Sequence, residues 1–410
     1  LDYIYKSQKN ISMKCRICDS KKIYGVVDLG KQPLANKYPK NKKEIVKEKK
    51  FNLKIFFCTR CKAAQIKKIV DRKYLFEDYY YLSSVNKKLK THFEKLATKL
   101  TKYKFVVDIG SNDGILLQPL KKHKVKAIGI DPSINVGKIA NDRGLKTFIS
   151  FFDKPIITKI LKKYPKPDLI VASSVVTHLD NPKKFAKNIK TFLVENGDLI
   201  IEIEYLQSFI KNLEFERFYF DRPFYYSANS INYLFNKEEM SLYDIEKIET
   251  HGGSLRCFIK NIRNFKKTNR CKKILNDEIK TLNLKSFKVF NNKIIKEVAR
   301  LKYNLSTLKK ENKMIIGYGA PARVSTITNF ANIDSNLLDF IIDDSPLKQH
   351  RYSPGKHIKI LSRKNNLNNK IDYVVVFAYE YFEEIKKKFK KLNVFFFKPI
   401  PFRRLKWVFY

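Results

Sequence analysis

The sequence predicts an α/β protein with three parts, a small N-terminal metal-binding module followed by two Rossmann-like units. Three observations lead to this prediction. Two Cys-x-x-Cys pairs lie near the N-terminus, Cys15 with Cys18 and Cys58 with Cys61. An apolar run leads into a glycine turn at residues 108–114, and a second such turn lies at residues 317–322. β-forming residues followed at once by glycine predict strand, tight turn and helix in both places.

The length and composition indicate a folded chain with more than one domain. At 410 residues the chain is long enough for two or three domains. Hydrophobic residues make up 44% and aromatic residues 13%, which excludes a disordered protein. No apolar run approaches the roughly 20 residues of a membrane span, and no signal peptide precedes the first motif. Because Met13 stands just before the first cysteine, residues 1–12 are a candidate upstream extension.

The charge balance is strongly basic, with 84 Lys and Arg residues against 40 Asp and Glu residues and a net charge of +44. Such a charge is typical of proteins that bind nucleic acid. The lysines, however, are spread along predicted helices throughout the chain, with no basic arm and no recognition motif. An AT-rich genome also produces many Lys, Asn and Ile residues, and charge bears on solubility rather than on fold. We therefore predict no specific nucleic-acid partner, although an anionic substrate would benefit from the positive field.

Each Cys-x-x-Cys pair presents two thiolates from one turn, and the two pairs together complete a tetrahedral Zn²⁺ site. Paired cysteines of this kind suit a metal in a reducing cytoplasm better than a disulfide framework. The long segment between the pairs should contain strands, at residues 26–29 and 52–57. No neighbouring His or Asp offers a fifth ligand, so we predict a closed, structural zinc site in a module of residues 13–68. Nucleic-acid binding by this module is the alternative.

The first glycine turn follows a predicted strand at residues 104–109, and a second strand at residues 126–130 ends at Asp131. A doubly wound sheet binds a ribose with an acidic residue placed in this way, about 20 residues after the turn. A dinucleotide would favour G-x-G-x-x-G, because its pyrophosphate lies on the helix N-terminus. Asn112 and Asp113 lie inside the turn instead, and an acidic side chain there would repel a pyrophosphate.

These side chains could instead hydrogen-bond the amino acid part of S-adenosylmethionine. We therefore predict a class I methyltransferase domain over residues 69–265, with a structural turn that binds no ligand as the alternative. The predicted cofactor-binding residues are Asp108, Gly110, Asn112, Asp113, Gly114, Asp131, Pro132 and Ser174.

The remainder of this domain alternates strands with helices, as a parallel sheet requires. Further strands are expected at residues 145–148, 168–171 and 197–203. Because loops at the carboxyl ends of parallel strands hold the ligands, His178 in the loop after the fourth strand is a candidate acid or base, with a structural role as the alternative. The tyrosines at residues 79–81 could assist proton transfer or only pack.

The C-terminal part begins with a Lys-rich helical connector over residues 268–310. The second glycine turn reads G-x-G-x-x-A after a strand at residues 314–317, and the next strand, at residues 338–342, ends at Asp343. This pattern suggests a dinucleotide site, although Pro321 in the turn weakens the match. With strands at residues 373–377 and 394–397, we predict a Rossmann-like domain over residues 266–410.

Five motifs occur in an order that resembles the three-domain, zinc-containing sugar C-methyltransferases, from about residue 15 to residue 401. The first consists of the two cysteine pairs together, and the other four are residues 109–114, 251–256, 317–322 and 354–360. This family transfers methyl groups from S-adenosylmethionine to nucleotide-linked keto-deoxysugars in antibiotic and surface-polysaccharide pathways. The resemblance implies the same enzyme class and a C-terminal domain that helps to enclose the substrate. The predicted substrate-binding residues are Arg222, His251, Arg256, Tyr318, Arg323 and Lys348.

One segment departs from the family. The family reads Tyr-His-Glu-His where this chain has Tyr219, Phe220, Asp221 and Arg222. The second His resembles the general base, and an Arg cannot take that role. Arg222 should also keep Asp221 ionised, which would lower the pKa of Asp221 and suit it to positioning.

We therefore predict His178 as the base, with Asp221, Tyr219, Tyr79 and Tyr81 as further catalytic candidates. The alternatives are methylation of an oxygen or nitrogen atom, or a repurposed scaffold without turnover. A further alternative is an NAD-linked oxidoreductase that uses residues 317–322.

Overall fold

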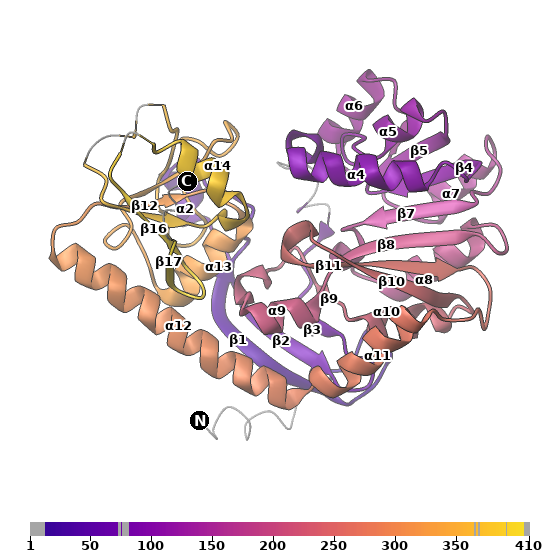
Figure 1. Cartoon of the computed structure of the whole chain (residues 1–410), viewed down its shortest axis with the longest axis horizontal. Coiled ribbons are helices and arrows are strands. Elements are labelled where there is room, and N and C mark those ends of the chain that lie inside the picture. Colours follow the sequence, from indigo (N-terminus) through magenta and orange to yellow (C-terminus); the bar gives the residue numbers. More distant parts are fainter. Residues whose placement is uncertain are drawn as a thin grey trace.

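The computed structural model describes residues 13–72, 75, 82–364, 366, 367, 370–390 and 392–405. Three β-sheets organise these residues. Figure 1 shows a lobe built on the central sheet and a lobe built on the C-terminal sheet, with the N-terminal strands and the long helix α12 below them. The predicted tyrosines Tyr79 and Tyr81 lie outside the described residues.

The N-terminal sheet is antiparallel, with the strand order β1-β2-β3-β9. Its strands are β1 (Ile23–Pro33), β2 (Lys50–Cys58), β3 (Ala64–Ile66) and β9 (Phe224–Tyr225). Both predicted strands are confirmed and extend further than expected, and the short helix α2 (Lys42–Val46) precedes β2. Because β9 belongs to the segment that carries Asp221 and Arg222, the zinc-binding module and the candidate catalytic segment share one sheet.

The central sheet has the order β10-β11-β8-β7-β4-β5-β6, in which β11 is antiparallel to both neighbours. All other neighbouring pairs are parallel, which confirms the predicted parallel sheet. The strands are β4 (Phe105–Ile109), β5 (Lys126–Asp131), β6 (Thr147–Ile149), β7 (Leu169–Ser173), β8 (Asp198–Glu204), β10 (Ser241–Ile248) and β11 (Ser254–Lys260). The order in which successive strands are added to the sheet reverses between β4 and β7, so ligand-binding loops should gather at the carboxyl ends of these two strands.

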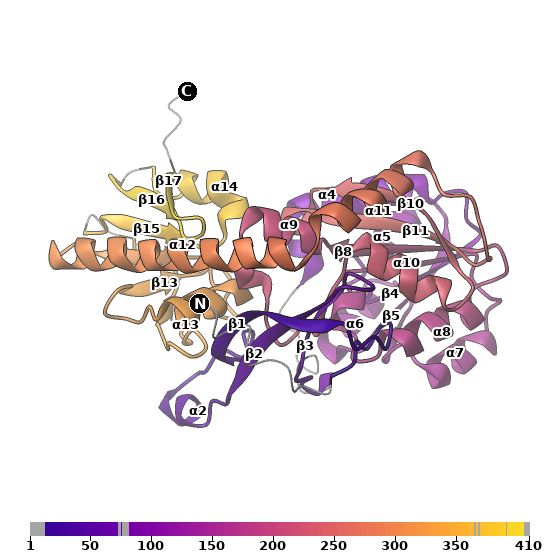
Figure 2. The same ribbon diagram turned by 90° about the horizontal axis from the view of Figure 1, so that it is seen from below.

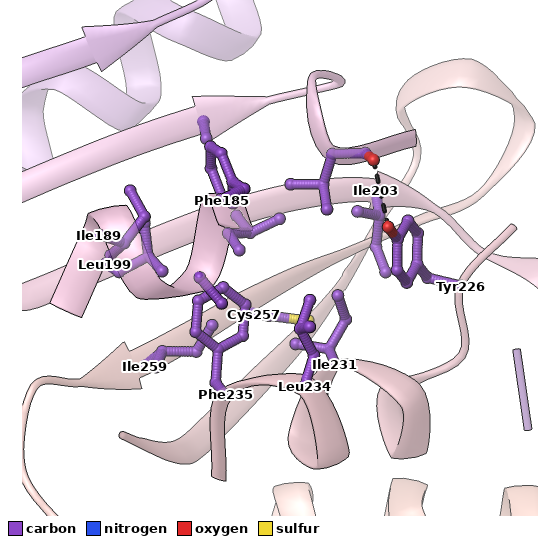
Figure 3. Packing of buried hydrophobic residues seen from close by; sticks show 14 of the residues in the cluster. Phe185, Ile189, Leu199, Ile203, Tyr226, Ile231, Leu234, Phe235, Cys257 and Ile259 are labelled. Carbon is purple, nitrogen blue, oxygen red and sulfur yellow. Dashed lines mark hydrogen bonds between the residues drawn. The ribbon is translucent and has the colours of Figure 1, made fainter. Parts of the chain in front are cut away.

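Helices cover both faces of the central sheet. Leu89 of α4 and Leu120 of α5 pack on one face with Val106 of β4. On the other face, Phe185 and Ile189 of α8 meet Ile231 and Phe235 of α10 over β8 and β11, as Figure 3 shows. The helices on the two faces are α4 (Lys87–Lys99), α5 (Leu117–Lys122), α6 (Ile134–Asp142), α7 (Lys154–Leu161), α8 (Pro182–Phe192), α10 (Ala228–Asn236) and α11 (Asn269–Thr281). Helix α9 (Leu206–Asn212) packs instead with the N-terminal sheet and with the long helix that follows α11.

The predicted helical connector consists of two helices, α11 and α12 (Leu284–Lys310), separated at residues 282 and 283. Asn283 has extended backbone, and its side chain accepts the amide hydrogen of Ser286 in a capping box, which begins the second helix at that point. The buried residues of α12 recur every three or four positions and pack against both β1 and the C-terminal sheet. They are Phe287, Phe290, Ile294, Val298, Leu301 and Leu305.

The C-terminal sheet has the order β14-β13-β12-β15-β16-β17 and is parallel except at β17. Its strands are β12 (Ile315–Tyr318), β13 (Phe340–Ile342), β14 (Ile360–Leu361), β15 (Tyr373–Val376), β16 (Phe395–Lys398) and β17 (Arg403–Leu405). Helices α13 (Ala322–Ala331) and α14 (Phe382–Lys387) complete the Rossmann-like unit, as predicted. Within the described residues, no helix combines the length and apolar composition that a bilayer crossing requires.

Candidate active site and zinc site

The glycine turn after β4 lies at the carboxyl edge of the central sheet. Gly110 has a φ of +74°, and its amide donates to the carbonyl oxygen of Ile130 at 2.7 Å. A Cβ atom at Gly110 would lie 2.2 Å from Cγ2 of Val175. Glycine is therefore required both by the left-handed backbone and by the loop after β7, which packs directly on the turn. Gly114, at +84°, is enclosed in the same way by Leu145.

The carboxylate of Asp131 lies over this turn. Its two oxygens accept the amide hydrogens of Asn112 and Ser133, each at 2.9 Å. Burial raises the pKa of Asp131, and these backbone hydrogen bonds partly oppose that rise. Each carboxylate oxygen has a further lone pair, so ribose hydroxyls can still donate to Asp131. Asp108 is also buried, and burial together with Asp131 and Glu202 raises its pKa well above the usual range.

The side chains of Asn112 and Asp113 accept hydrogen bonds from the segment that precedes α4. The Asn112 side chain accepts the Ser83 amide hydrogen at 3.0 Å, and Asp113 accepts that of Ser84 at 3.3 Å. Arg143 Nη1 lies 3.4 Å from the Asp113 carboxylate. These contacts fasten residues 83 and 84 over the glycine turn. The expected contact of Asp113 with the amino acid part of the cofactor stays a prediction.

The other residues of this edge fit an adenosyl cofactor. Among the described residues, no hydrogen-bond partner reaches the buried hydroxyls of Ser111, Ser173 and Thr177, which lie on the glycine turn and around the end of β7. Ser174 has a φ of +57° and its amide donates to the carbonyl oxygen of Glu202, while Pro132 follows Asp131 directly. Unpartnered buried hydroxyls beside a glycine turn and a ribose-type carboxylate are suited to a polar ligand.

His178 lies at the end of η2 (Val176–His178), in the loop that packs on Gly110. Its Nδ1 is 2.6 Å from the carbonyl oxygen of Asp221. Because a carbonyl oxygen only accepts hydrogen bonds, we assign the ring proton to Nδ1, and Nε2 of the neutral ring then carries a lone pair. The predicted base and the predicted positioning residue are thus in contact, through the backbone of Asp221.

Arg222 lowers the pKa of Asp221 as predicted, but the net direction of the shift is the opposite of the predicted one. Burial raises the pKa of Asp221, and this outweighs the opposing hydrogen bond from Asn36, at 2.7 Å, and the charge of Arg222. Arg222 is directed elsewhere, since its Nη2 pairs with Glu204 at the end of β8 and its guanidinium lies 4.9 Å from the centre of the Tyr219 ring. Burial also raises the pKa of Tyr219 to about 12.

The second glycine turn is engaged by the N-terminal module. The Tyr38 hydroxyl donates to the carbonyl oxygen of Ala320 at 2.7 Å, and Lys348 Nζ donates to the same oxygen at 3.0 Å. The Ala320 amide donates to Asp343 at 2.6 Å. The backbone groups that a dinucleotide would use at Ala320 are therefore already hydrogen-bonded within the chain. Because Asn36 contacts Asp221, residues 36–38 join the two candidate ligand-binding regions.

The remaining predicted substrate residues are placed in three environments. Arg323 donates to Glu380 at 2.7 Å, and Arg217 of the central domain reaches the same oxygen at 2.9 Å. Tyr318 donates to Asp344 at 3.0 Å. Arg256 is buried among carboxylates on β11, 2.7 Å from Glu202 and 3.0 Å from Glu246. His251 lies in η4 (Thr250–Gly252), and its side chain is outside the described part of the chain.

Sequence reasoning missed several residues of this region, namely Asn36, Tyr38, Glu204, Arg217 and Glu380. Glu204 carried a usable signal, because it ends a predicted strand as Asp131 does. Asn36 and Tyr38 carried none, since the residues that they contact are 185 and 282 positions away.

The four cysteines of the N-terminal pairs form a compact cluster. Cys15 and Cys61 have sulfur atoms 3.6 Å apart, Cys18 and Cys58 have theirs 3.5 Å apart, and all four lie within 4.8 Å of one another. Thiolates about 2.3 Å from a tetrahedral zinc ion are roughly 3.8 Å apart, so this donor set fits zinc. All four are buried, and no other group of ligand side chains among the described residues is close enough to join them. The predicted zinc site is confirmed.

Three family models match consecutive parts of the chain. A zinc binding domain matches residues 15–76, a methyltransferase domain matches residues 81–241, and a C-methyltransferase C-terminal domain matches residues 249–401. The C-methyltransferase NovU of Streptomyces niveus is 24% identical over 400 residues, which are 95% of each chain.

Two solved structures are similar to part of the chain. A SAM-dependent methyltransferase of Thermotoga maritima is 19% identical, with a TM-score of 0.34, over 42% of this chain and 88% of that chain. The magnesium protoporphyrin IX methyltransferase of Synechocystis PCC 6803 is 14% identical, with a TM-score of 0.35, over 44% of this chain and 90% of that chain.

The doubly wound sheet, the Gly110 turn under Asp131 and the methyltransferase-domain match define an S-adenosylmethionine-dependent methyltransferase. The prediction of this enzyme class and cofactor is thereby confirmed. In this chain the methyltransferase domain follows a zinc-binding domain and precedes a C-methyltransferase C-terminal domain.

Proposed function

We propose that this enzyme transfers a methyl group to a carbon atom of a nucleotide-linked keto-deoxysugar in the cytoplasm, for a surface polysaccharide or a related glycan. The observation that carries the proposal is the 2.6 Å contact between Nδ1 of His178 and the Asp221 carbonyl, on a loop packed against Gly110. The name of the relative NovU supports carbon as the acceptor atom. The order of the sequence motifs supports the sugar.

The chemistry requires removal of one proton from the carbon next to the ketone. Bound S-adenosylmethionine supplies an electrophilic methyl group on a positively charged sulfur. Nε2 of neutral His178 accepts the carbon-bound proton, and the imidazolium that forms keeps its Nδ1 hydrogen bond to Asp221. The loop and the glycine turn would bind the acceptor and the cofactor next to each other, since direct displacement depends mainly on alignment.

The C-terminal side of the site should bind the nucleotide. Arg222 stays positively charged at any accessible pH, so we assign it to an anionic oxygen of the substrate rather than to proton transfer. Arg323, Lys348 and Tyr318 are our candidates for the diphosphate and its nucleoside. Arg256 is a weaker candidate, because it pairs with two carboxylates, Glu202 and Glu246, whereas Arg222 and Arg323 each pair with one.

The Arg222–Glu204 pair favours a second candidate function. A buried ion pair stands where the family has a proton acceptor, so the same scaffold could methylate an oxygen or nitrogen atom or bind its ligands without turnover.

Methyl transfer to a panel of nucleotide-linked sugars distinguishes the candidates. Wild-type protein should form a new carbon–methyl bond, seen by NMR of the product, and His178→Ala should be slower by at least about 100-fold. His178→Ala should also stop solvent deuterium from entering the carbon next to the ketone. Undiminished transfer by His178→Ala would remove His178 as the base. An oxygen- or nitrogen-methylated product, or activity only in Arg222→His, would replace the proposal with the second candidate.

A further inference from the structure

Helices α11 and α12 expose several large apolar side chains among lysines. Ile279, Val289, Ile295 and Tyr303 are 55%, 46%, 50% and 72% exposed. Figures 1 and 2 show α12 along the outside of the molecule, with α9 near one end and the C-terminal sheet beside the other. The "α12 face" is defined here as Val289, Ile295 and Tyr303 together with the exposed cations Lys285, Lys288, Lys293, Lys296, Arg300 and Lys310.

The helix geometry separates these residues from the core. Phe287, Ile294 and Leu301 face the protein, so the residues between them at helical spacing point outward. With 27 residues, α12 is about 40 Å long, since each residue adds about 1.5 Å. Glu297 is the one acidic residue of α12, and its carboxylate accepts the amide hydrogen of Phe402 at 2.8 Å. Within residues 284–310 the α12 face therefore presents cations without an exposed acidic residue, and the exposed Glu311 follows at the C-cap.

Two surface grooves flank the same helix. One, of about 410 Å³, is lined by Lys211, Lys285 and Lys293 beside the apolar side chains of Ile210, Leu213, Val289 and Phe290. The other, of about 210 Å³, is lined by Tyr303, Leu308 and three aromatic residues of the C-terminal sheet, Tyr373, Phe395 and Phe397. Both grooves combine polar or cationic groups with apolar and aromatic side chains. This combination suits a surface in which negatively charged headgroups cover an apolar layer.

We propose that the α12 face docks on an anionic lipid bilayer. The lysines pair with lipid phosphates while Val289, Ile295 and Tyr303 enter the region between headgroups and acyl chains. The apolar side chains are separated by lysines and form no contiguous patch, so a fluid lipid surface covers them better than a rigid protein surface does. Nucleic acid would use the lysines but would gain nothing from the apolar side chains.

Sedimentation with vesicles tests the proposal on the full chain. Wild-type protein should sediment with phosphatidylcholine vesicles that contain phosphatidylglycerol and not with phosphatidylcholine alone. The triple variant Lys285→Glu, Lys293→Glu and Lys296→Glu should weaken this binding by at least about 100-fold. The matched control reverses three exposed lysines of the α7 region, Lys159→Glu, Lys162→Glu and Lys163→Glu, and should retain most of it. Equal loss in both triple variants would overturn the proposal, because net charge alone would explain the binding.

A second variant separates a bilayer from nucleic acid at constant charge. Replacing Val289, Ile295 and Tyr303 with Ser should weaken vesicle binding and leave binding to duplex DNA unchanged. If the serine variant binds vesicles like wild type, the apolar contact does not exist and the proposal fails. All three substituted positions are exposed, so circular dichroism and thermal unfolding should match wild type.

Discussion

Asp221 and Arg222 are neighbours in the sequence, yet burial gives them separate partners. Asn36 contacts the carboxylate of Asp221, and Glu204 pairs with the guanidinium of Arg222. An adjacent opposite charge predicts a lowered carboxyl pKa, but complete burial reverses that direction for Asp221. The chemical role of such a residue therefore depends on its depth in the fold more than on its neighbour in the chain.

We predict that Arg222→Met destabilises the protein by about 3–5 kcal/mol, because the Glu204 carboxylate is 1% exposed and loses its cation. Urea unfolding of the single variant and of the double variant with Glu204→Gln measures this effect. The double variant should recover much of the lost stability, because Glu204→Gln leaves no charge at this position that needs a cation. Equal destabilisation of the two variants would show that packing, and not charge, is what Arg222 contributes.

Among the structural elements, the turn after β4 is constrained by backbone and by packing together. Gly110→Ala adds a left-handed alanine and a clash with Val175, so we expect S-adenosylmethionine affinity to fall by at least about tenfold and stability to fall by more than about 1 kcal/mol. Calorimetry with the cofactor and denaturant unfolding measure the two effects.

Gly30→Ala is the matched control for this turn. Gly30 has a φ of +67°, and no atom of the described residues lies within 4 Å of the position that a Cβ would take. Gly30→Ala should therefore cost only the unfavourable backbone conformation, about 1 kcal/mol. Gly110→Ala combined with Val175→Ala should recover part of the cofactor affinity. If Gly110→Ala costs no more than Gly30→Ala and binds the cofactor normally, the packing argument is wrong.

At the scale of the whole molecule, the zinc site is connected to the candidate catalytic segment through the strand pair β3–β9. Metal analysis should find about one zinc per chain, and chelation should release it and loosen the N-terminal module. Hydrogen exchange should then increase in residues 23–66 and also in residues 219–226, because β9 loses its partner strand. Exchange that rises only in residues 23–66 would contradict this coupling. Helix α4, whose buried residues pack in a different cluster from the cysteines, serves as the internal reference.

The junction between the central and C-terminal domains should respond to pH. Burial, only partly offset by Arg217, raises the pKa of Glu214 to about 7. At pH values between the pKa of Glu214 in the unfolded chain and about 7, the folded chain keeps a proton on Glu214 that the unfolded chain has lost. The free energy of unfolding should therefore fall as pH rises through this range. We expect wild type to lose about 1–3 kcal/mol between about pH 5 and pH 7, and Glu214→Gln to lose less.

Glu380→Gln is the control for this junction. Although burial opposes them, Arg323 and Arg217 lower the pKa of Glu380 to about 2. Above about pH 5 the Glu380 carboxylate is therefore ionised in the folded and in the unfolded chain. Glu380→Gln should then be less stable than wild type by a similar amount at about pH 5 and at about pH 7. A Glu214→Gln protein with the wild-type pH dependence would show that the Glu214 proton is not the cause.

The sequence alone determined the order of the parts and much of each part. Hydrophobic runs followed by glycine identified the strands and turns of both Rossmann-like units, because short-range sterics decide where a chain turns sharply. The spacing of the cysteines predicted the zinc site for a similar local reason, since two ligands come from each turn.

Only the tertiary structure decided how these parts meet. Contacts such as Tyr38 with Ala320 and Asn36 with Asp221 join residues that are hundreds of positions apart, and no periodicity encodes them. The raised pKa of Asp221 and the pairing of Arg222 with Glu204 likewise arise from burial, which depends on the whole packed chain. Local sequence therefore specified the elements and the ligand-binding turns, while packing between domains specified the charge state and the partners of the catalytic candidates.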